Sequence, residues 1–283
     1  MNAAAHFDGE SYNNIKRNEV ENMKLKWYGT ATILLEQDGT QLLFDPFLSL
    51  SNKVFKPPLD ELATVENILV THGHLDHIAD IPAIVQQGKN NAAVYCTAKP
   101  YETLISKGVV PECIHKIAPG DVMNFGPFEV RALKGKHIVF DSGLIIKTLF
   151  NPRILTNWGN LRDMLKENRQ CVEGDETVVY DISAANKRIL LMGSLNLDGA
   201  TEYPRGTDLL ILPLQGRSDI SRYAMRYVER LHPKKILPDH FDDTFPPISS
   251  SVNTEPFISL MRQKYPDIPV ICPQASAKWI DIE

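Results

Sequence analysis

The chain has 283 residues, of which 43% are hydrophobic and 23% charged, a balance typical of a soluble globular protein with a sizeable core. Its formal charge is −5 and it has no run of five basic residues, which argues against a nucleic-acid-binding protein with a basic face. No stretch approaches the roughly 18 apolar residues of a membrane-spanning helix, so we expect no such helix.

The first 22 residues are polar and rich in asparagine, and they lack the apolar stretch of a secretory signal. We therefore expect residues 1–22 to form an extension, and the folded domain to cover residues 23–283. The four cysteines form no C-x-x-C pair, which favours reduced thiols and a cytoplasmic protein.

Strand patterns dominate the first half of the chain from Met23 onward. The segment "TILLEQDGTQLLFD" predicts two strands joined by an Asp-Gly turn. Asp80, Pro82 and Gly88 mark the start and end of a helix. The remaining elements expected in this half are strands at 24–30, 66–72, 92–96 and 125–137 and a helix near 99–107.

Residues 138–176 form a connection longer than most loops, with a helix expected at 157–169, and we predict that it acts as a lid or wall. Alternating strands and helices resume after it. They are strands at 176–183, 188–194, 207–214, 234–240 and 268–273, and helices at 219–231 and 254–264. In the helix at 219–231, helical spacing places five apolar residues on one face: Ile220, Ala224, Tyr227, Val228 and Leu231.

Two strand-rich halves that each collect helices predict an α/β fold. Because each sheet must bury one face, the simplest arrangement is two mixed sheets packed together with helices outside, in four αββα layers.

The segment "VTHGHLDHIAD", at residues 70–80, crowds three histidines and two aspartates together, which is costly unless they hold a cation. His72 and His74 are two residues apart, so in an extended segment both can face one ion. Asp76 and His77 follow at a turn and can serve a second point nearby. Imidazole and carboxylate suit zinc and similar divalent ions.

Two further histidines, His137 and His240, each end a predicted strand, where α/β folds place their chemistry. We expect both to join the cluster. His6, His115 and His232 have no such setting, and we expect them to be ordinary surface or core residues.

The segment "THGHLDHIAD" resembles the signature of the metallo-β-lactamase superfamily, and the resemblance covers nearly all of residues 23–281. The segment "WYGTATILLEQDGTQLLFDPF" is similar to the opening strands of the branch that contains ascorbate-phosphate lactonases and N-acyl phosphatidylethanolamine phospholipase D. The resemblance implies a four-layer αββα sandwich with one or two divalent ions at one edge. Zinc is the first expectation, and the same ligands serve manganese or iron.

The resemblance also implies roles for individual residues. The expected ligands of one ion are His72, His74 and His137, and those of a second are Asp76, His77 and His240. Asp76 and His240 are the expected catalytic residues, beside a metal-bound hydroxide that attacks the substrate. Asp45 stands where the family has an aspartate that braces the metal loop.

The chain departs from the family pattern at two positions. Thr30 replaces a histidine that is frequent in the branch. Ser194 replaces the bridging aspartate, so the ligand set loses one negative charge. Asp242, two residues after His240, is a candidate replacement ligand, and the alternative is an ordinary turn residue. Because "MGSLN" is not a nucleophile elbow, we do not expect Ser194 to attack the substrate. We expect it to be a substrate-binding residue.

Substrate selection is expected in the connections around the site. Arg217 follows a predicted strand and could hold an anionic group, or it could be a solvated residue at a helix start. Trp158 could contact the substrate from the lid, or it could be a core residue.

These features predict a metal-dependent hydrolase of a small-molecule lactone, ester or phosphodiester. Two alternatives remain. The loss of the bridging acid suggests a non-catalytic member that binds metal or a ligand, and the superfamily also contains nucleases, which the acidic composition disfavours. The oligomeric state is open, and a homo-oligomer is one option.

Overall fold

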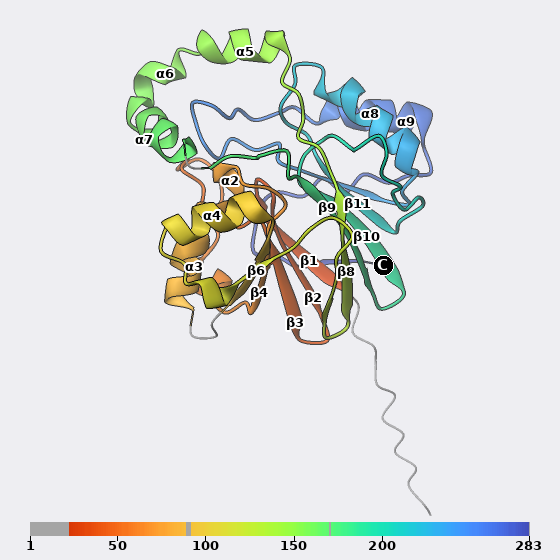
Figure 1. Cartoon of the computed structure of the whole chain (residues 1–283). Helices are drawn as coiled ribbons and strands as arrows, with labels where there is room; N and C mark the ends of the chain where they lie inside the picture. The colour runs from red at the N-terminus through yellow and green to blue at the C-terminus, as the bar shows by residue number, and fades with distance from the viewer. Residues whose placement is uncertain (1–22, 89–91, 170, 283) are drawn as a thin grey trace, which may run out of the picture.

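The computed structural model describes residues 23–88, 92–169 and 171–282, so the extension expected at residues 1–22 lies outside the described residues. Two sheets face each other, one of seven strands and one of six, and helices cover their outer faces (Figure 1). The predicted αββα arrangement is confirmed.

The first sheet has the strand order β13-β1-β2-β3-β4-β5-β6. Its strands are β1 (Lys24–Gly29), β2 (Thr32–Gln37), β3 (Thr40–Phe44), β4 (Asn67–Leu69), β5 (Ala93–Cys96), β6 (Ile114–Lys116) and β13 (Ile280–Asp281). Asp38 and Gly39 connect β2 to β3 and both have positive φ, as a two-residue hairpin turn requires. From β3 to β6 the strands run parallel, so their carboxyl ends meet at one edge.

The second sheet has the strand order β12-β11-β10-β9-β8-β7. Its strands are β7 (Val122–Phe125), β8 (Phe128–Lys134), β9 (Val178–Ala184), β10 (Lys187–Met192), β11 (Leu209–Pro213) and β12 (Ile236–Asp239). The strands from β7 to β10 are antiparallel, and β10, β11 and β12 are parallel.

Three apolar layers hold the sandwich together. Between the sheets, Phe44 of β3 meets Tyr180 of β9 with ring centroids 5.5 Å apart. Helices α1 (Leu59–Leu62), α2 (Leu75–Ile78), α3 (Ile81–Gln87) and α4 (Ala98–Ser106) belong to the layer on the first sheet. Helices α8 (Ile220–Leu231) and α9 (Glu255–Lys264) cover the second sheet, and the five apolar residues predicted to share a face of α8 are buried.

The prediction of a strand at 268–273 is wrong. Only one bridge forms there, between Val270 and Ile236, because Pro269 and Pro273 have no N–H to donate to a ladder. Three short strands escaped the sequence pattern, namely β6, β7 and β13. β6 and β13 depend on partners farther away along the chain, as when Ile280 pairs with Leu25 of β1, whereas β7 is a short strand that pairs with the neighbouring β8.

The connection at 138–176 contains three helices where the sequence predicted one. The expected helix at 157–169 is α7 (Trp158–Asn168), and it is preceded by α5 (Ser142–Leu149) and α6 (Arg153–Thr156). Asp141 caps α5 by accepting a hydrogen bond from the backbone N–H of Leu144. The three helices arch beside one edge of the sandwich, and α7 packs against α2 (Figure 1). No helix among the described residues is long and apolar enough to cross a membrane.

Gly193, directly after β10, marks a close approach between the two sheets. A Cβ atom at this position would lie 2.1 Å from the Cβ of Thr71, which follows β4 of the other sheet. Only glycine allows this contact, which sets the end of β10 against the loop that carries the histidines.

We expect Gly193→Ala to lower the free energy of unfolding by about 3 kcal/mol or more, because backbone or loop must move to relieve the overlap. Gly199→Ala is the matched control, since a Cβ there meets nothing within 4 Å. Chemical denaturation of the two variants checks this. Equal stability of both would show that the close approach is absent.

Candidate metal centre

The loop after β4 carries four of the predicted ligands. His72 and His74 precede α2, and the backbone of His74 is extended at the start of that helix. Asp76 and His77 stand in the single turn of α2. Gly73 makes this course possible, because a Cβ there would lie 2.3 Å from the carbonyl oxygen of Val172. The end of the lid segment is thus packed against the loop.

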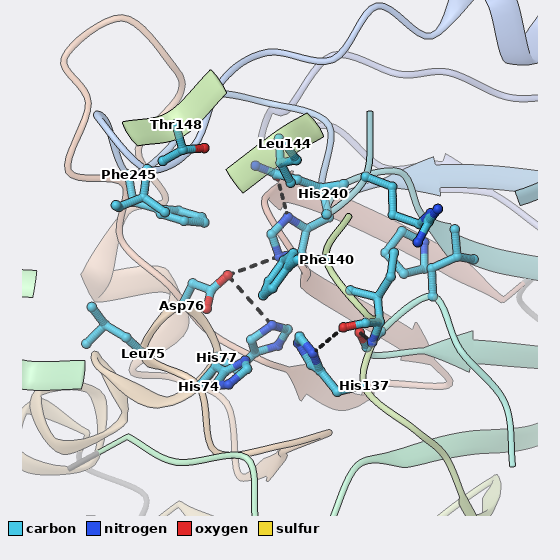
Figure 2. A pocket seen from close by; sticks show the side chains of 18 of the residues that line it. His74, Leu75, Asp76, His77, His137, Phe140, Leu144, Thr148, His240 and Phe245 are labelled. Carbon is cyan, nitrogen blue, oxygen red and sulfur yellow. Dashed lines mark hydrogen bonds and ion pairs between the residues drawn. The ribbon is translucent and has the colours of Figure 1, made fainter. Parts of the chain in front are cut away.

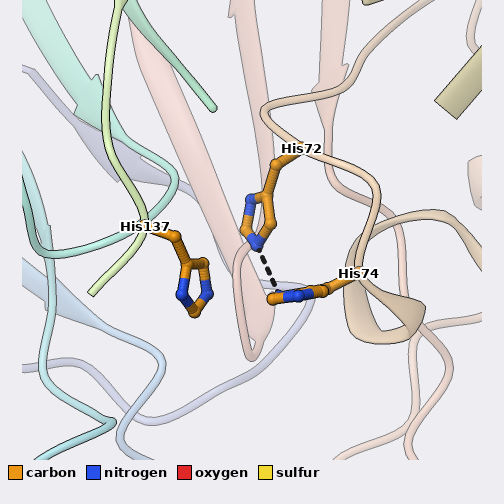
Figure 3. A group of neighbouring side chains, drawn as sticks. All are labelled: His72, His74 and His137. Carbon is orange, nitrogen blue, oxygen red and sulfur yellow. Dashed lines mark hydrogen bonds between the residues drawn. The ribbon is translucent and has the colours of Figure 1, made fainter. Parts of the chain in front are cut away.

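His72, His74 and His137 form the first group, with ligand nitrogens that all lie within 4.8 Å of one another (Figure 3). The Nε2 atom of His72 is 3.2 Å from the Nδ1 atom of His74. His137 comes from the end of β8 in the other sheet, and its ring centroid is 4.5 Å from that of His74. The first group therefore joins both sheets.

Asp76, His77 and His240 form the second group (Figure 2). The Asp76 Oδ2 atom lies 3.0 Å from Nε2 of His240 and 3.8 Å from Nε2 of His77. His240 follows β12, so this group also takes its members from both sheets. The six residues expected from the sequence are thus brought together in two adjacent triads.

Asp45 anchors the loop from behind, as expected from its place in the sequence. Its carboxylate, which is fully buried, accepts hydrogen bonds from the N–H (2.7 Å) and the Oγ1–H (2.6 Å) of Thr71. It also lies 2.8 Å from Nδ1 of His77. Because the Thr71 hydroxyl donates to Asp45, it can accept from Nδ1–H of His72 at 3.0 Å.

His137 and His240 also have acceptors at Nδ1, whereas Nδ1 of His74 faces Nε2 of His72. Nδ1 of His137 is 2.9 Å from the carbonyl oxygen of Ile138, and Nδ1 of His240 is 2.8 Å from Oε1 of Gln215. In the rings of His72, His77 and His137, Nδ1–H can therefore donate outward, which leaves the Nε2 lone pair for the group. His240 also donates from Nδ1–H, but its raised pKa means that Nε2 carries a proton, donated to Asp76, until a metal ion displaces it. Metal-binding histidines are held in this way by their outer partners.

Gln215 contacts the second group through His240 and was not expected from the sequence. It stands two residues after β11, at the same edge of the sandwich as the histidines. Its place at the end of a predicted strand was the signal available. A glutamine carries no obvious chemistry, so only its contact with His240 reveals its role.

The two groups have opposite electrostatics. Burial and the neighbouring histidines lower the pKa values of His72, His74 and His137, that of His137 to about 4. Burial also opposes charge on His240, but its hydrogen bond with Asp76 raises its pKa to about 9. Burial would raise the pKa of Asp76, yet the nearby His77 and His240 hold it below its ordinary value.

The donor atoms fit divalent ions. Neutral imidazole nitrogens converge in the first group, and one carboxylate with two imidazoles forms the second, which are ligands that zinc, iron and manganese accept. Behind the second group, the Oδ1 atom of Asp239 is buried and has no hydrogen-bond partner in the described part of the chain. A cation beside His240 would supply a countercharge for this acid.

Ser194 and Asp242, the two residues at the departure from the family pattern, have other partners. The Ser194 Oγ accepts a hydrogen bond from the N–H of Ile138 at 3.0 Å, and so holds the segment just after His137. Asp242 accepts hydrogen bonds from the N–H of Thr30 at 2.9 and 3.2 Å, and it belongs to neither triad. A metal-binding role for Asp242 stays a prediction.

An apolar cavity of about 430 Å³ lies above the two triads (Figure 2). Arg217 and Ser194 line it, and their role in substrate binding stays a prediction. The guanidinium of Arg217 is bonded to Asp219 at 2.6 Å and to the carbonyl oxygen of Val139 at 3.0 Å. Trp158 does not line the cavity and is 62% exposed, so the structure does not bring it to the site.

Comparison with known proteins agrees with this geometry. Residues 40–241 match the sequence model of the family described as the beta-lactamase superfamily domain. The chain belongs to the metallo-β-lactamase superfamily. Relatives of this chain within the superfamily are named metal-dependent hydrolases, and this chain is a metal-dependent hydrolase too. The likeness to the lactonase and phospholipase D branch stays a prediction.

Several relatives carry the name UPF0173 metal-dependent hydrolase, and two of them illustrate the similarity. One from Carboxydothermus hydrogenoformans is 29% identical over 233 residues, which cover 81% of this chain and 89% of the relative. One from Cupriavidus taiwanensis is 30% identical over 230 residues, covering 76% and 73%. A solved metallo hydrolase from Ignicoccus hospitalis has a TM-score of 0.61 at 16% identity, covering 93% and 100%, and it shows the shared metallo-β-lactamase fold.

We expect Gln215→Leu to weaken metal binding at the second triad by about 10- to 100-fold, because Nδ1–H of His240 loses its acceptor. Binding at the first triad should not change. Gln215→Glu is the control, since it keeps a carbonyl-type oxygen at the same place. Metal titration by calorimetry measures both affinities, and equal affinity in the Leu variant would contradict the role given to Gln215.

The metal affinities of the two triads should depend on pH in different ways. Binding at the second triad must displace a proton from His240, so its affinity should fall about tenfold per pH unit below about 9. The first triad, with pKa values already lowered, should bind equally well from about pH 6 upward. Zinc titrations at about pH 6 and pH 9 test this, and identical dependence at both sites would contradict it.

Proposed function

We propose that this metallo-β-lactamase superfamily member hydrolyses an ester or lactone bond of a small uncharged molecule, with one or two divalent ions and zinc as the first choice. The ions would be held by His72, His74 and His137 and by Asp76, His77 and His240. When bound, such an ion supplies a Lewis acid and makes water acidic enough to yield hydroxide near neutral pH.

Asp76 is the residue proposed to orient the attacking water and take its proton. Its lowered pKa keeps it as a carboxylate at neutral pH, which is the form that accepts a proton. Its Oδ2 is aimed between His240 and His77. His240, kept in place by Gln215, is the second proposed catalytic residue.

The observation that carries the choice of an uncharged substrate is the lining of the cavity. Apart from the triads, Arg217 is its one charged lining residue among the described residues. The guanidinium of Arg217 already interacts with Asp219 and with a backbone carbonyl. A carbonyl group next to the triads needs no further cation, so an ester or lactone fits these walls better than a highly charged substrate.

A phosphodiester is the second candidate, and a different observation favours it. The six residues of the two triads include a single carboxylate, Asp76. Two divalent ions there would leave an excess of positive charge, which suits an anionic substrate. Asp45, which lies 2.8 Å from Nδ1 of His77, offsets part of this charge, whereas burial raises the pKa values of Asp239 and Asp242 and so disfavours charge on them.

We further propose that the protein works in the cytoplasm on a small molecule, without a nucleic-acid partner. Its four cysteines are free, which suits a reducing compartment. A homo-oligomer remains the open option for its assembly.

The test is hydrolysis of a p-nitrophenyl ester, a lactone and bis-p-nitrophenyl phosphate by the zinc-, manganese- and iron-loaded protein. We expect ester or lactone turnover that a chelator abolishes and that His72→Ala loses. Turnover of the phosphodiester alone would select the second candidate. Metal content without turnover on any of the three would favour a non-catalytic, ligand-binding member.

A further inference from the structure

We propose that the cavity holds an aliphatic chain of the substrate, clamped between the lid helices α5 and α7 on one side and the loops of the sandwich on the other. The bond to be cleaved then lies at the triads on the cavity floor. This inference rests on the proposed function, because it assigns the cavity to the substrate of that site.

Two helices of the lid, α5 and α7, each present apolar side chains to the cavity. From α7 come Leu161, Met164 and Leu165, whose spacing of three and four residues places them on one side of the helix. From α5 come Leu144 and Ile145. These five side chains are all aliphatic or thioether chains, which adapt to a flexible hydrocarbon better than rigid rings do.

The opposite wall is apolar apart from Ser250. It is lined by Phe47, Phe245, Ile248 and Val252, which come from the loops after β3 and after β12. Phe47 and Phe245 pack edge to face with their centroids 6.0 Å apart. A chain lying between this wall and the lid would therefore meet apolar atoms on both sides.

Apart from the triads, the lining has five polar side chains, of which Thr148 and Ser250 stand in the walls and the other three are bonded to other partners. Ser194 accepts from the N–H of Ile138, Gln215 from His240, and Arg217 donates to Asp219 and to the Val139 carbonyl. A polar arm placed there would lose water and gain few hydrogen bonds, which is unfavourable. An apolar arm has no such cost.

The cavity opens to solvent through an apolar rim. Phe140, Ile145, Leu165 and Ile248 line the cavity and are also 42–56% exposed. A volume of about 430 Å³ lies within the range of pockets that enclose small ligands, and it exceeds what one ester group needs. A chain can therefore enter past the rim with its reactive end toward the triads.

The first test measures binding without chemistry. Calorimetry with butanol, hexanol, octanol and decanol on the zinc-loaded protein should show Kd falling by about fourfold per added methylene until the cavity is full. These alcohols are uncharged, so their binding does not depend on a carboxylate that seeks the metal. A Kd independent of chain length would overturn the proposal.

A matched pair of variants tests whether the aliphatic chain of the ligand contacts the lid helix α5. Ile145 and Ile146 are neighbours on α5 with similar exposure, 48% and 56%, but only Ile145 lines the cavity. We expect Ile145→Asp to weaken octanol binding at least tenfold and to remove the dependence on length, whereas Ile146→Asp should leave both unchanged. Equal effects of the two variants would overturn the assignment to this cavity.

Hydrolysis of p-nitrophenyl acetate, hexanoate and decanoate separates the two proposals. If kcat/KM rises with chain length in the wild type and not in Ile145→Asp, both stand. If all three esters react equally and alcohols do not bind, the proposed function stands and the chain-binding proposal fails. If alcohols bind in a length-dependent way but no ester, lactone or phosphodiester reacts, the proposed function fails and the aliphatic binding site stands.

Discussion

The buried carboxylate of Asp45 is the interaction on which the site depends. A charge that is fully buried is costly unless it is hydrogen-bonded, and here the N–H and hydroxyl of Thr71 and Nδ1–H of His77 surround it. Through the hydroxyl of Thr71 the same carboxylate also fixes His72. One acid thus sets the ring orientation of one histidine in each triad before any metal is considered.

The triads work as connections between the two sheets. Each combines residues of the loop after β4 with one histidine from the second sheet, His137 after β8 or His240 after β12. The supporting contacts cross the same boundary, with Gly193 against Thr71, and Asp242 accepting from Thr30. Because an ion binds only the assembled triads, metal binding should stabilise the docking of the two sheets.

The lid segment, residues 138–176, is the proposed link between the metal centre and the substrate. It begins directly after His137, is held by Ser194 at Ile138, and returns to pack Val172 against Gly73. Both of its ends are therefore fixed to the metal loop, while α5 and α7 between them form a wall of the cavity. Changes in α5 or α7 can alter the choice of substrate without moving a ligand.

The sequence by itself determined the chemistry and the general fold. The spacing of His72, His74, Asp76 and His77 indicates two metal points because alternate side chains of an extended segment share a face. Strand ends at His137 and His240 indicated the remaining ligands, and strand and helix periodicity gave the four layers. These signals come from residues that are close together in the chain, so the sequence alone reveals them.

Only the tertiary structure decided what depends on distant contacts. It gave Ser194 a backbone partner at Ile138 and Asp242 one at Thr30, showed Gln215 behind His240, and left Trp158 away from the cavity. It also formed β13, whose two residues make a strand only because β1 offers an edge. The partners in these contacts stand 25 to 212 residues apart in the chain, or 255 for Leu25 and Ile280, and no local pattern records them.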